Sequence, residues 1–148
     1  IIFPNENQGG TVRKIVMYYT TISSVDNRII MIPNANLTNS TIVNVTAMEK
    51  RKLEIKVGVS YSSDLKEAKG ILQRLVEAEP RFLAEEQQFF VDSLGESSIT
   101  VGLRAWVRTD DYWPVKWEMN EKIKQEFDQA GIEIPYPQLD VHLKEQGN

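Results

Sequence analysis

The chain has 148 residues, of which 41% are hydrophobic and 26% are charged, as is typical of a folded globular protein. It contains no cysteine, which excludes a disulfide framework and a thiolate metal site. No apolar run approaches the roughly 18 residues that a membrane-spanning helix needs, and no signal-peptide pattern opens the chain. The net charge of −4 is unevenly distributed, since residues 1–52 carry six Lys and Arg against three Asp and Glu. A basic segment next to a membrane would suit anionic headgroups, and a chance distribution of solvated charges is an equally good explanation.

A β-hairpin with a sharp turn is the most informative part of the first fifty residues. Asp26 and Asn27 predict the turn, because both side chains can bond their own backbone and both tolerate left-handed conformations. Residues 28–32 are a nearly unbroken apolar run, which predicts a strand buried on both faces. Pro33 ends that strand, and Asn34 can cap the turn that follows.

Further short strands surround this hairpin. Residues 11–19 are rich in Thr, Val, Ile and Tyr, residues 1–3 are apolar, and residues 41–46 are also β-prone. Residues 34–39 predict a turn or a single helical turn. Five short strands in about fifty residues, without a long helix, predict a small open barrel of the Sm-like kind for residues 1–50.

A charged run at residues 48–52 separates this pattern from a different one. Residues 53–59 alternate between apolar and polar side chains, which predicts a half-buried strand. Asp64 and Glu67 have the spacing of a helix capping box, and apolar residues at helical spacing continue from there until Pro80.

The rest of this second domain predicts two more strands, a helix and a short closing strand. The strands cover residues 88–94 and 99–107. The helix starts after Asp110 and Asp111, which we interpret as its cap, and it carries a predicted apolar stripe of Trp113, Trp117, Ile123 and Phe127. Gly131 suits a left-handed helix end, and residues 132–134 predict the final strand. The order β-α-β-β-α-β predicts a ferredoxin-like domain over residues 51–135.

Residues 136–148 follow as a tail that contains one amphipathic strand. Apolar and polar side chains alternate there, as Leu139, Asp140, Val141, His142 and Leu143. Pro135 and Pro137 stiffen the exit from the preceding domain. Because so short a strand needs a partner for its backbone groups, we expect it to pair with the same strand of neighbouring copies.

The residues offer little catalytic or cofactor chemistry. His142 is the only histidine, so a histidine-based metal cluster is excluded, and its position on an alternating tail favours a solvated or interface role. Asp110 and Asp111 are explained by helix capping, and no glycine-rich phosphate loop follows a predicted strand. We therefore expect neither an enzyme nor a bound cofactor or metal.

Two sets of motifs stand out, one in each predicted domain. In the first domain they are Gly10, Val12, Thr21, Asp26, Ile32, Pro33, Asn34 and Asn44. Near the end, Phe-Asp-Gln-Ala-Gly-Ile occupies residues 127–132 and Ile-Pro-Tyr-Pro-Gln occupies residues 134–138. Together they resemble the motifs of the cytoplasmic part of small-conductance mechanosensitive (MscS-like) channels, with the second set matching the family's closing motif. The match runs from about residue 9 to residue 143, although the segment at residues 1–7 lacks the strand and helix that precede this region in the family.

This resemblance implies a soluble vestibule on the cytoplasmic side of the inner membrane. Seven copies would form a hollow cage under the pore, with side portals between subunits, and their tail strands would join into a small barrel. Ions and small osmolytes would pass through the cage on hypo-osmotic shock, while tension sensing would belong to membrane helices outside this stretch.

RNA binding is the alternative, because Sm-like and ferredoxin-like folds both host RNA-binding proteins. An RNA-recognition motif would place basic and aromatic residues on the strand at residues 99–107, where only Trp106 is aromatic. Residues 53–148 also carry eleven basic against eighteen acidic residues, which disfavours phosphate binding.

Overall fold

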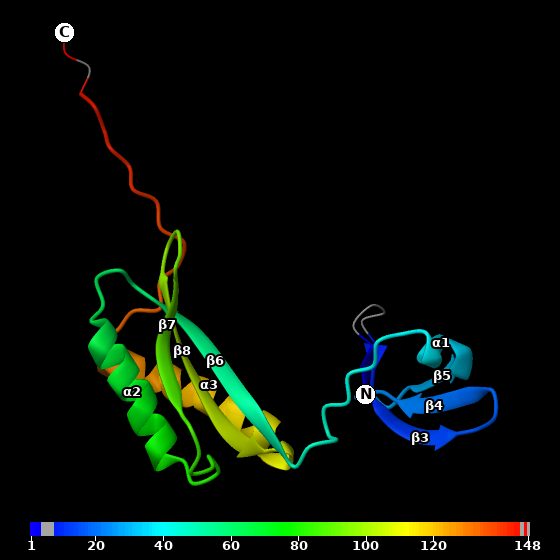
Figure 1. Ribbon diagram of the computed structural model, residues 1–148. Helices are drawn as coiled ribbons and strands as arrows, with labels where there is room; N and C mark the ends of the chain where they lie inside the picture. Colours follow the sequence, from blue (N-terminus) through cyan, green and yellow to red (C-terminus); the bar gives the residue numbers. More distant parts are fainter. Residues whose placement is uncertain (4–7, 146, 148) are drawn as a thin grey trace. The chain divides into compact units, whose positions relative to one another are not determined.

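The structure is a computed structural model that describes residues 1–3, 8–145 and 147. The chain divides into two units, Ile1–Glu49 and Lys50–Asn148, called here the N-terminal and C-terminal units (Figure 1). Together they give an α+β protein with small antiparallel sheets in both units and a long helix near the C-terminus.

The N-terminal unit contains two small antiparallel sheets. They are formed by β1 (Ile2–Phe3) with β2 (Gln8–Gly9), and by β3 (Thr11–Ile15), β4 (Tyr19–Ser23) and β5 (Ile29–Pro33) in that order. A single-turn helix, α1 (Asn34–Thr38), follows β5. The predicted turn at Asp26 and Asn27 is confirmed, because Asn27 has a φ of 63° between the paired strands β4 and β5. The core is small and is centred on Ile22 and Ile32.

Several expectations for this unit are wrong. The strand predicted over residues 11–19 is interrupted by a turn, because β3 ends at Ile15 and β4 begins at Tyr19. The strand at residues 28–32 is not buried on both faces, since the side chains of Ile29 and Met31 are 64% and 62% exposed. The sheet covers one face only, so alternate residues of β5 face solvent. Residues 41–46 do not form a strand, because Val43 makes only an isolated bridge with Ile2 and the chain turns soon afterwards.

The C-terminal unit contains a three-stranded antiparallel sheet and two long helices. Its elements are β6 (Lys50–Val59), α2 (Leu65–Ala78), β7 (Gln88–Leu94), β8 (Ile99–Arg108), a 3₁₀ turn (Thr109–Asp111) and α3 (Tyr112–Gln129), with the strand order β6-β8-β7. Buried side chains from both helices join those of β6 and β8 in one hydrophobic cluster. The two helices therefore cover the same face of the sheet, and the opposite face is left uncovered by the described part of this chain.

Several local predictions for this unit are confirmed. The carboxylate of Asp64 accepts hydrogen bonds from the backbone N–H groups of Lys66 (2.9 Å) and Glu67 (3.3 Å), as expected of a helix cap. Gly131 has a φ of 71° just after α3, the left-handed conformation predicted for it. The alternating apolar residues of β8 are all buried in the core, namely Ile99, Val101, Leu103, Ala105 and Val107.

The second long helix of this unit, α3, and its surroundings differ from expectation in three ways. Trp113 and Trp117 are 49% and 63% exposed, and the buried stripe of α3 is Val115, Met119, Ile123 and Phe127. Six residues separate Trp117 from Ile123, which is about 600° of helical rotation, so the two side chains lie on different faces. Asp111 begins α3 without a side-chain cap hydrogen bond.

The third difference concerns residues 132–134, which do not form the predicted closing strand. The N–H group of Ser60 donates to the carbonyl of Glu133 (2.9 Å), which places this segment beside the end of β6, but a regular ladder is absent from the described residues. One hydrogen bond is too few to define a strand. The described residues of the tail that follows also lie outside any helix or strand (Figure 1).

Candidate functional site

Asn34 is the most connected side chain among the motif residues of the N-terminal unit. Its Oδ1 accepts a hydrogen bond from Thr20 Oγ1 (2.7 Å), and its Nδ2 donates to the carbonyls of Val16 (2.7 Å) and Met17 (3.2 Å). Its backbone N–H donates to the carbonyl of Tyr18 (2.8 Å). Asn34 therefore holds the turn between β3 and β4 in place, and the expectation that it caps α1 is wrong, since Pro33 occupies the cap position.

Gly10 is required by a close approach of two backbones. A Cβ atom at this position would lie 2.3 Å from the carbonyl oxygen of Ser23 and 2.6 Å from Cγ2 of Ile22, so only glycine fits. Val12 pairs with Ile22 on β4 just before a β-bulge in β3. These motif residues determine how closely β3 and β4 pack.

Asp26 stabilises the turn between β4 and β5, at the end of these strands opposite to Asn34. Ser24 Oγ donates to Asp26 Oδ1, and Arg28 Nε lies 2.7 Å from Asp26 Oδ2. The hydrogen bond from Ser24, followed by that from Arg28, holds the pKa of the Asp26 carboxyl below its usual value. The side chain is highly exposed, so this is a turn-stabilising arrangement rather than a reactive carboxylate.

The remaining motif residues do not gather at one point. Ile32 is buried in the core, Pro33 ends β5, and Thr21 lies in the middle of β4. Asn44 lies in a separate turn, where its Oδ1 accepts from the backbone N–H of Thr46 (3.2 Å). The motif is therefore a set of positions that shape the backbone, and it is not a cluster of reactive groups.

Thr20 was missed by the sequence reasoning, which singled out Thr21. Thr20 is 3% exposed, and its hydroxyl donates the hydrogen bond that Asn34 Oδ1 accepts. Neighbouring threonines on a strand point to opposite faces, and only the register with β5 decides which of the two faces Asn34.

The predicted alternation of the tail lies in a segment that pairs with no strand among the described residues. His142 Nε2 lies 3.3 Å from Asp140 Oδ2, and both side chains are largely exposed. The backbone N–H of Gln138 donates to Ser97 Oγ (3.1 Å) and ties the start of the tail to the turn between β7 and β8. The apolar members of the tail are strongly exposed, at 86%, 61% and 92% for Leu139, Val141 and Leu143.

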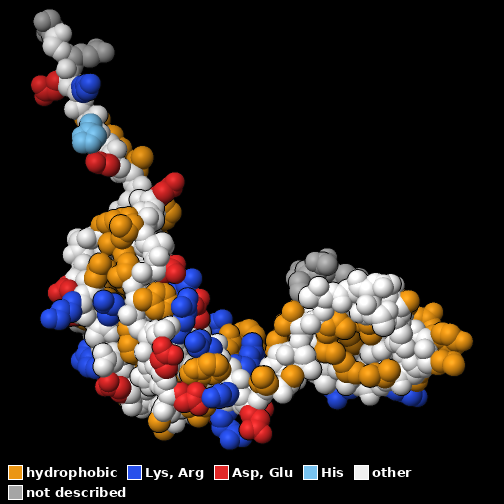
Figure 2. Space-filling view, viewed as in Figure 1, with side chains coloured by type: hydrophobic (Ala, Val, Ile, Leu, Met, Phe, Trp, Pro, Cys, Tyr) orange, Lys and Arg blue, Asp and Glu red, His pale blue; other side chains and the backbone are white. Residues whose placement is uncertain are grey.

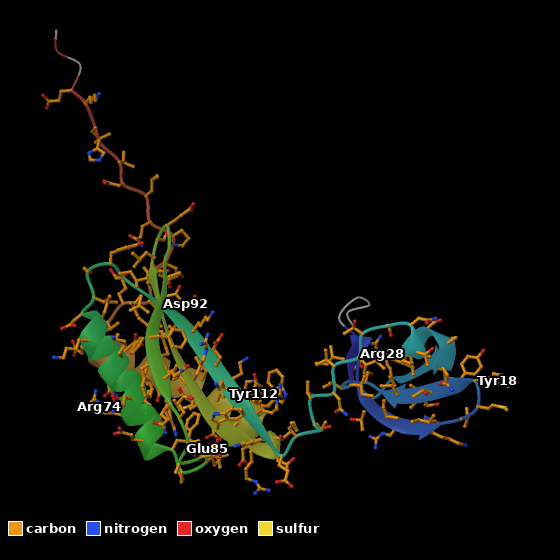
Figure 3. All side chains as sticks on the ribbon, viewed as in Figure 1. Tyr18, Arg28, Arg74, Glu85, Asp92 and Tyr112 are labelled. Atoms are coloured by element: carbon orange, nitrogen blue, oxygen red, sulfur yellow. The ribbon has the colours of Figure 1, made fainter. Side chains whose placement is uncertain are left out.

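The uncovered face of the C-terminal sheet carries interleaved charges. Arg104 Nε donates to Glu54, and Lys56 Nζ lies 3.5 Å from Glu54 and 3.2 Å from Asp92, which is labelled in Figure 3. The hydrogen bond with Arg104 lowers the pKa of Glu54, and the one with Asp92 raises the pKa of Lys56. These cations are already paired with carboxylates, which makes this part of the face a poor site for phosphate.

A nearly buried carboxylate connects the two helices of the C-terminal unit. Glu79 is 7% exposed and lies 2.7 Å from Arg81 Nε and 3.4 Å from Lys122 Nζ on α3. Arg81 also pairs with Glu118 of α3. The hydrogen bonds from Arg81 are the main reason that the pKa of Glu79 falls to about 2. This network stabilises the packing of the helices.

The described residues provide neither a metal cluster nor a membrane span. They contain no group of three or more His, Asp and Glu side chains arranged to hold a metal ion. None of the helices among them is long and apolar enough to cross a bilayer. A shallow surface hollow beside Asn34 is lined by Met17, Tyr18, Tyr19, Pro33, Asn34 and Ala35.

Both units match known family models. "Mechanosensitive ion channel, beta-domain" matches residues 2–47, and "Mechanosensitive ion channel MscS, C-terminal" matches residues 53–134. A "Small-conductance mechanosensitive channel" of Edwardsiella ictaluri is 34% identical over 135 residues, which are 90% of this chain and 47% of that protein. An "Uncharacterized MscS family protein" of Archaeoglobus fulgidus is 38% identical over 130 residues, which are 87% of this chain and 46% of that protein.

The fold agrees with these sequence matches. The closed-state MscS of Helicobacter pylori has a TM-score of 0.85 at 27% identity, over 93% of this chain and 55% of that chain. The chain thus spans about half the length of the curated relatives that it matches. It belongs to the MscS family of mechanosensitive ion channels.

Proposed function

We propose that this chain is the cytoplasmic vestibule of a mechanosensitive channel, which releases ions and small osmolytes on hypo-osmotic shock. The observation that carries the proposal is the consecutive match of the beta-domain and C-terminal family models. In this function the vestibule lies on the cytoplasmic side of the inner membrane, and the gate belongs to membrane helices of the parent protein.

The proposed architecture has three parts. Residues 1–50 form an Sm-like β domain, residues 51–135 form a ferredoxin-like domain, and residues 136–148 supply a barrel strand and tail. The hydrogen bond between Ser60 and Glu133 supports the second assignment, because it places residues 132–134 next to the strand that a closing ferredoxin strand would pair with.

Assembly of seven copies explains the apolar surface that a single chain leaves exposed. In a closed ring the tail strands of neighbouring copies supply each other's hydrogen-bonding partners and remove free strand edges. The apolar residues Leu139, Val141 and Leu143 then face one side of a small barrel, and Asp140 and His142 face the other. Side portals between subunits provide the path for permeating solutes.

The vestibule needs no catalytic residues, and we propose that the chain is not an enzyme. The matching family models describe ion channels and give no support to the RNA-binding alternative. The ion pairs on the uncovered sheet face also argue against RNA, because the cations of Lys56 and Arg104 are neutralised by neighbouring carboxylates.

The mass of the purified chain in solution tests this function. A ring of identical copies predicts about seven times the 17.0 kDa of one chain in light scattering and native mass spectrometry. A chain that remains a monomer at high micromolar concentration and retards RNA on a gel would overturn the proposal in favour of the alternative. A monomer without RNA binding would contradict self-assembly of this stretch.

A further inference from the structure

The turn between β3 and β4 exposes five consecutive apolar or aromatic side chains. Residues 15–19, called here the β3–β4 tip, have exposures of 71%, 42%, 83%, 71% and 44% for Ile15, Val16, Met17, Tyr18 and Tyr19. Figure 2 shows the apolar side chains gathered at this end of the N-terminal unit, and Figure 3 shows Tyr18 directed into solvent. An exposed apolar patch of this kind marks a contact surface in proteins.

The tip is held in one conformation although its side chains lack a covering partner in the described chain. The backbone N–H of Val16 donates to the carbonyl of Tyr19 (2.9 Å), and Asn34 binds the carbonyls of Val16, Met17 and Tyr18. A preorganised surface loses little backbone entropy when it binds. Its exposure is therefore a property of the folded turn and is not caused by fraying.

The charged residues next to the tip on β3 are both cations. Arg13 and Lys14 immediately precede it on β3, and both are exposed. The acidic residues among the described part of this unit are Asp26 and Glu49. Asp26 is paired with Arg28 beyond the far ends of β4 and β5, which are five residues long, or roughly 17 Å. The tip thus combines apolar side chains with two cations, and the paired carboxylate of Asp26 lies at the opposite end of the same sheet.

We propose that the β3–β4 tip binds the anionic headgroup surface of a lipid bilayer. Tyrosine is enriched at membrane interfaces, where its ring is buried and its hydroxyl remains hydrated. Lys and Arg beside such a surface are attracted by anionic lipids. A second tip would repel these cations, whereas a bilayer accepts the apolar side chains and attracts the charges. This inference goes beyond the vestibule function and does not depend on how many copies assemble.

Co-sedimentation with vesicles tests the proposal on the complete chain. We expect binding to vesicles of phosphatidylglycerol and phosphatidylcholine, and much weaker binding to phosphatidylcholine alone. The double substitution Arg13→Gln and Lys14→Gln should weaken binding about 25-fold, at roughly fivefold for each cation. Met17→Ser with Tyr18→Ser should weaken it by at least about tenfold. Val25→Ser is the matched control, because Val25 is fully exposed at the opposite turn, beside a neutralised arginine.

Labelled cysteine variants test which turn enters the bilayer. Because the chain has no native cysteine, Tyr18→Cys and Val25→Cys can each carry a single environment-sensitive fluorophore. Anionic vesicles should shift the emission to the blue only at position 18. Equal binding to both kinds of vesicle, or equal shifts at both positions, would overturn the proposal. A change of the chain's mass in tip variants without lipid would instead show that a second copy covers the tip, and it would also overturn the proposal.

Discussion

The two units of this protein bury their apolar side chains to very different extents. Among the described residues, the C-terminal unit has a core of eighteen buried hydrophobic side chains, and the N-terminal unit has a core of two. The N-terminal unit leaves several large apolar side chains exposed, including Ile29 and Met31 of β5. Because apolar burial is the main favourable term in folding, the stability of the C-terminal unit comes largely from within one chain.

The conformation of the N-terminal unit depends more on close backbone packing and hydrogen bonds than on a large apolar core. Its strands are held by a glycine that lets two backbones approach and by an asparagine that holds a turn, namely Gly10 and Asn34. Polar interactions of this kind define a conformation but contribute only about 1 kcal/mol each. In the described chain, the N-terminal unit and the tail thus leave large apolar side chains exposed that the C-terminal core does not cover.

Removal of the tail is expected to have the largest effect on assembly. Deletion of residues 138–148 should raise the dissociation constant of the proposed ring by at least about tenfold. Three apolar side chains per copy, which are exposed in the single chain, could then no longer be buried between copies. Light scattering under dilution measures the change, and circular dichroism should show that both units remain folded. Deletion of residues 145–148 alone is the control. An oligomer as stable as the full-length chain would refute the tail's proposed role.

Phe127→Ala should destabilise the C-terminal unit by about 3–5 kcal/mol, since its fully buried ring fills the core between α3 and the sheet. Trp117→Ala, on the exposed face of the same helix, should change the free energy of unfolding by no more than about 1 kcal/mol. Denaturant titration followed by circular dichroism compares them. Similar losses from both would mean that the core does not dominate the stability of this unit.

Glu79→Gln should cost the C-terminal unit on the order of 2 kcal/mol at pH 7. The folded pKa of Glu79 is lowered from 4.5 to about 2, so its contribution is present above pH 4.5 and is lost as the pH falls towards 2. The difference between wild type and variant, measured by denaturation at several pH values, should therefore shrink over this window. Glu96→Gln, in the exposed turn before β8, is the control. A difference that does not depend on pH would contradict the assigned network.

Asn34→Ala should destabilise the turn between β3 and β4 by about 1–2 kcal/mol, because the buried hydroxyl of Thr20 loses its acceptor and two carbonyls lose a donor. Hydrogen exchange at the amide of Val16 should become faster. Asn36→Ala, on the exposed side of α1, serves as the control. Unchanged exchange in the Asn34 variant would show that the turn does not need this side chain.

Gly131→Val should destabilise the C-terminal unit by on the order of 1 kcal/mol, because a β-branched residue is strained at a φ of 71°. The space around this position is open, so strain and not steric clash is the cause. Gly70→Ala offers a comparison of opposite sign, since Gly70 lies in α2 with open space around it and should gain about 0.5–1 kcal/mol. Unchanged denaturant midpoints in the Gly131 variant would be inconsistent with this explanation.

The sequence by itself determined the features that depend on neighbouring residues. Asp26 and Asn27 form the predicted turn, Asp64 caps α2, and Gly131 adopts the left-handed conformation. The alternation in β6 and β8 correctly predicted which side chains enter the core. Each of these follows from local backbone preference or from a strand's period of two, and both can be predicted from residues that are close together in the sequence.

The tertiary structure alone decided which β-prone segments find a partner and which apolar faces remain exposed. Residues 41–46 and 132–134 have strand-like sequences, but in the described chain only isolated hydrogen bonds or bridges hold them. Ile29 and Trp117 have the residue types of a core, yet they lie on uncovered faces. Strand pairing and burial join residues that are distant in the sequence. A sequence pattern therefore predicts which segments are able to pair or pack, and the packing of the whole fold decides which of these contacts form.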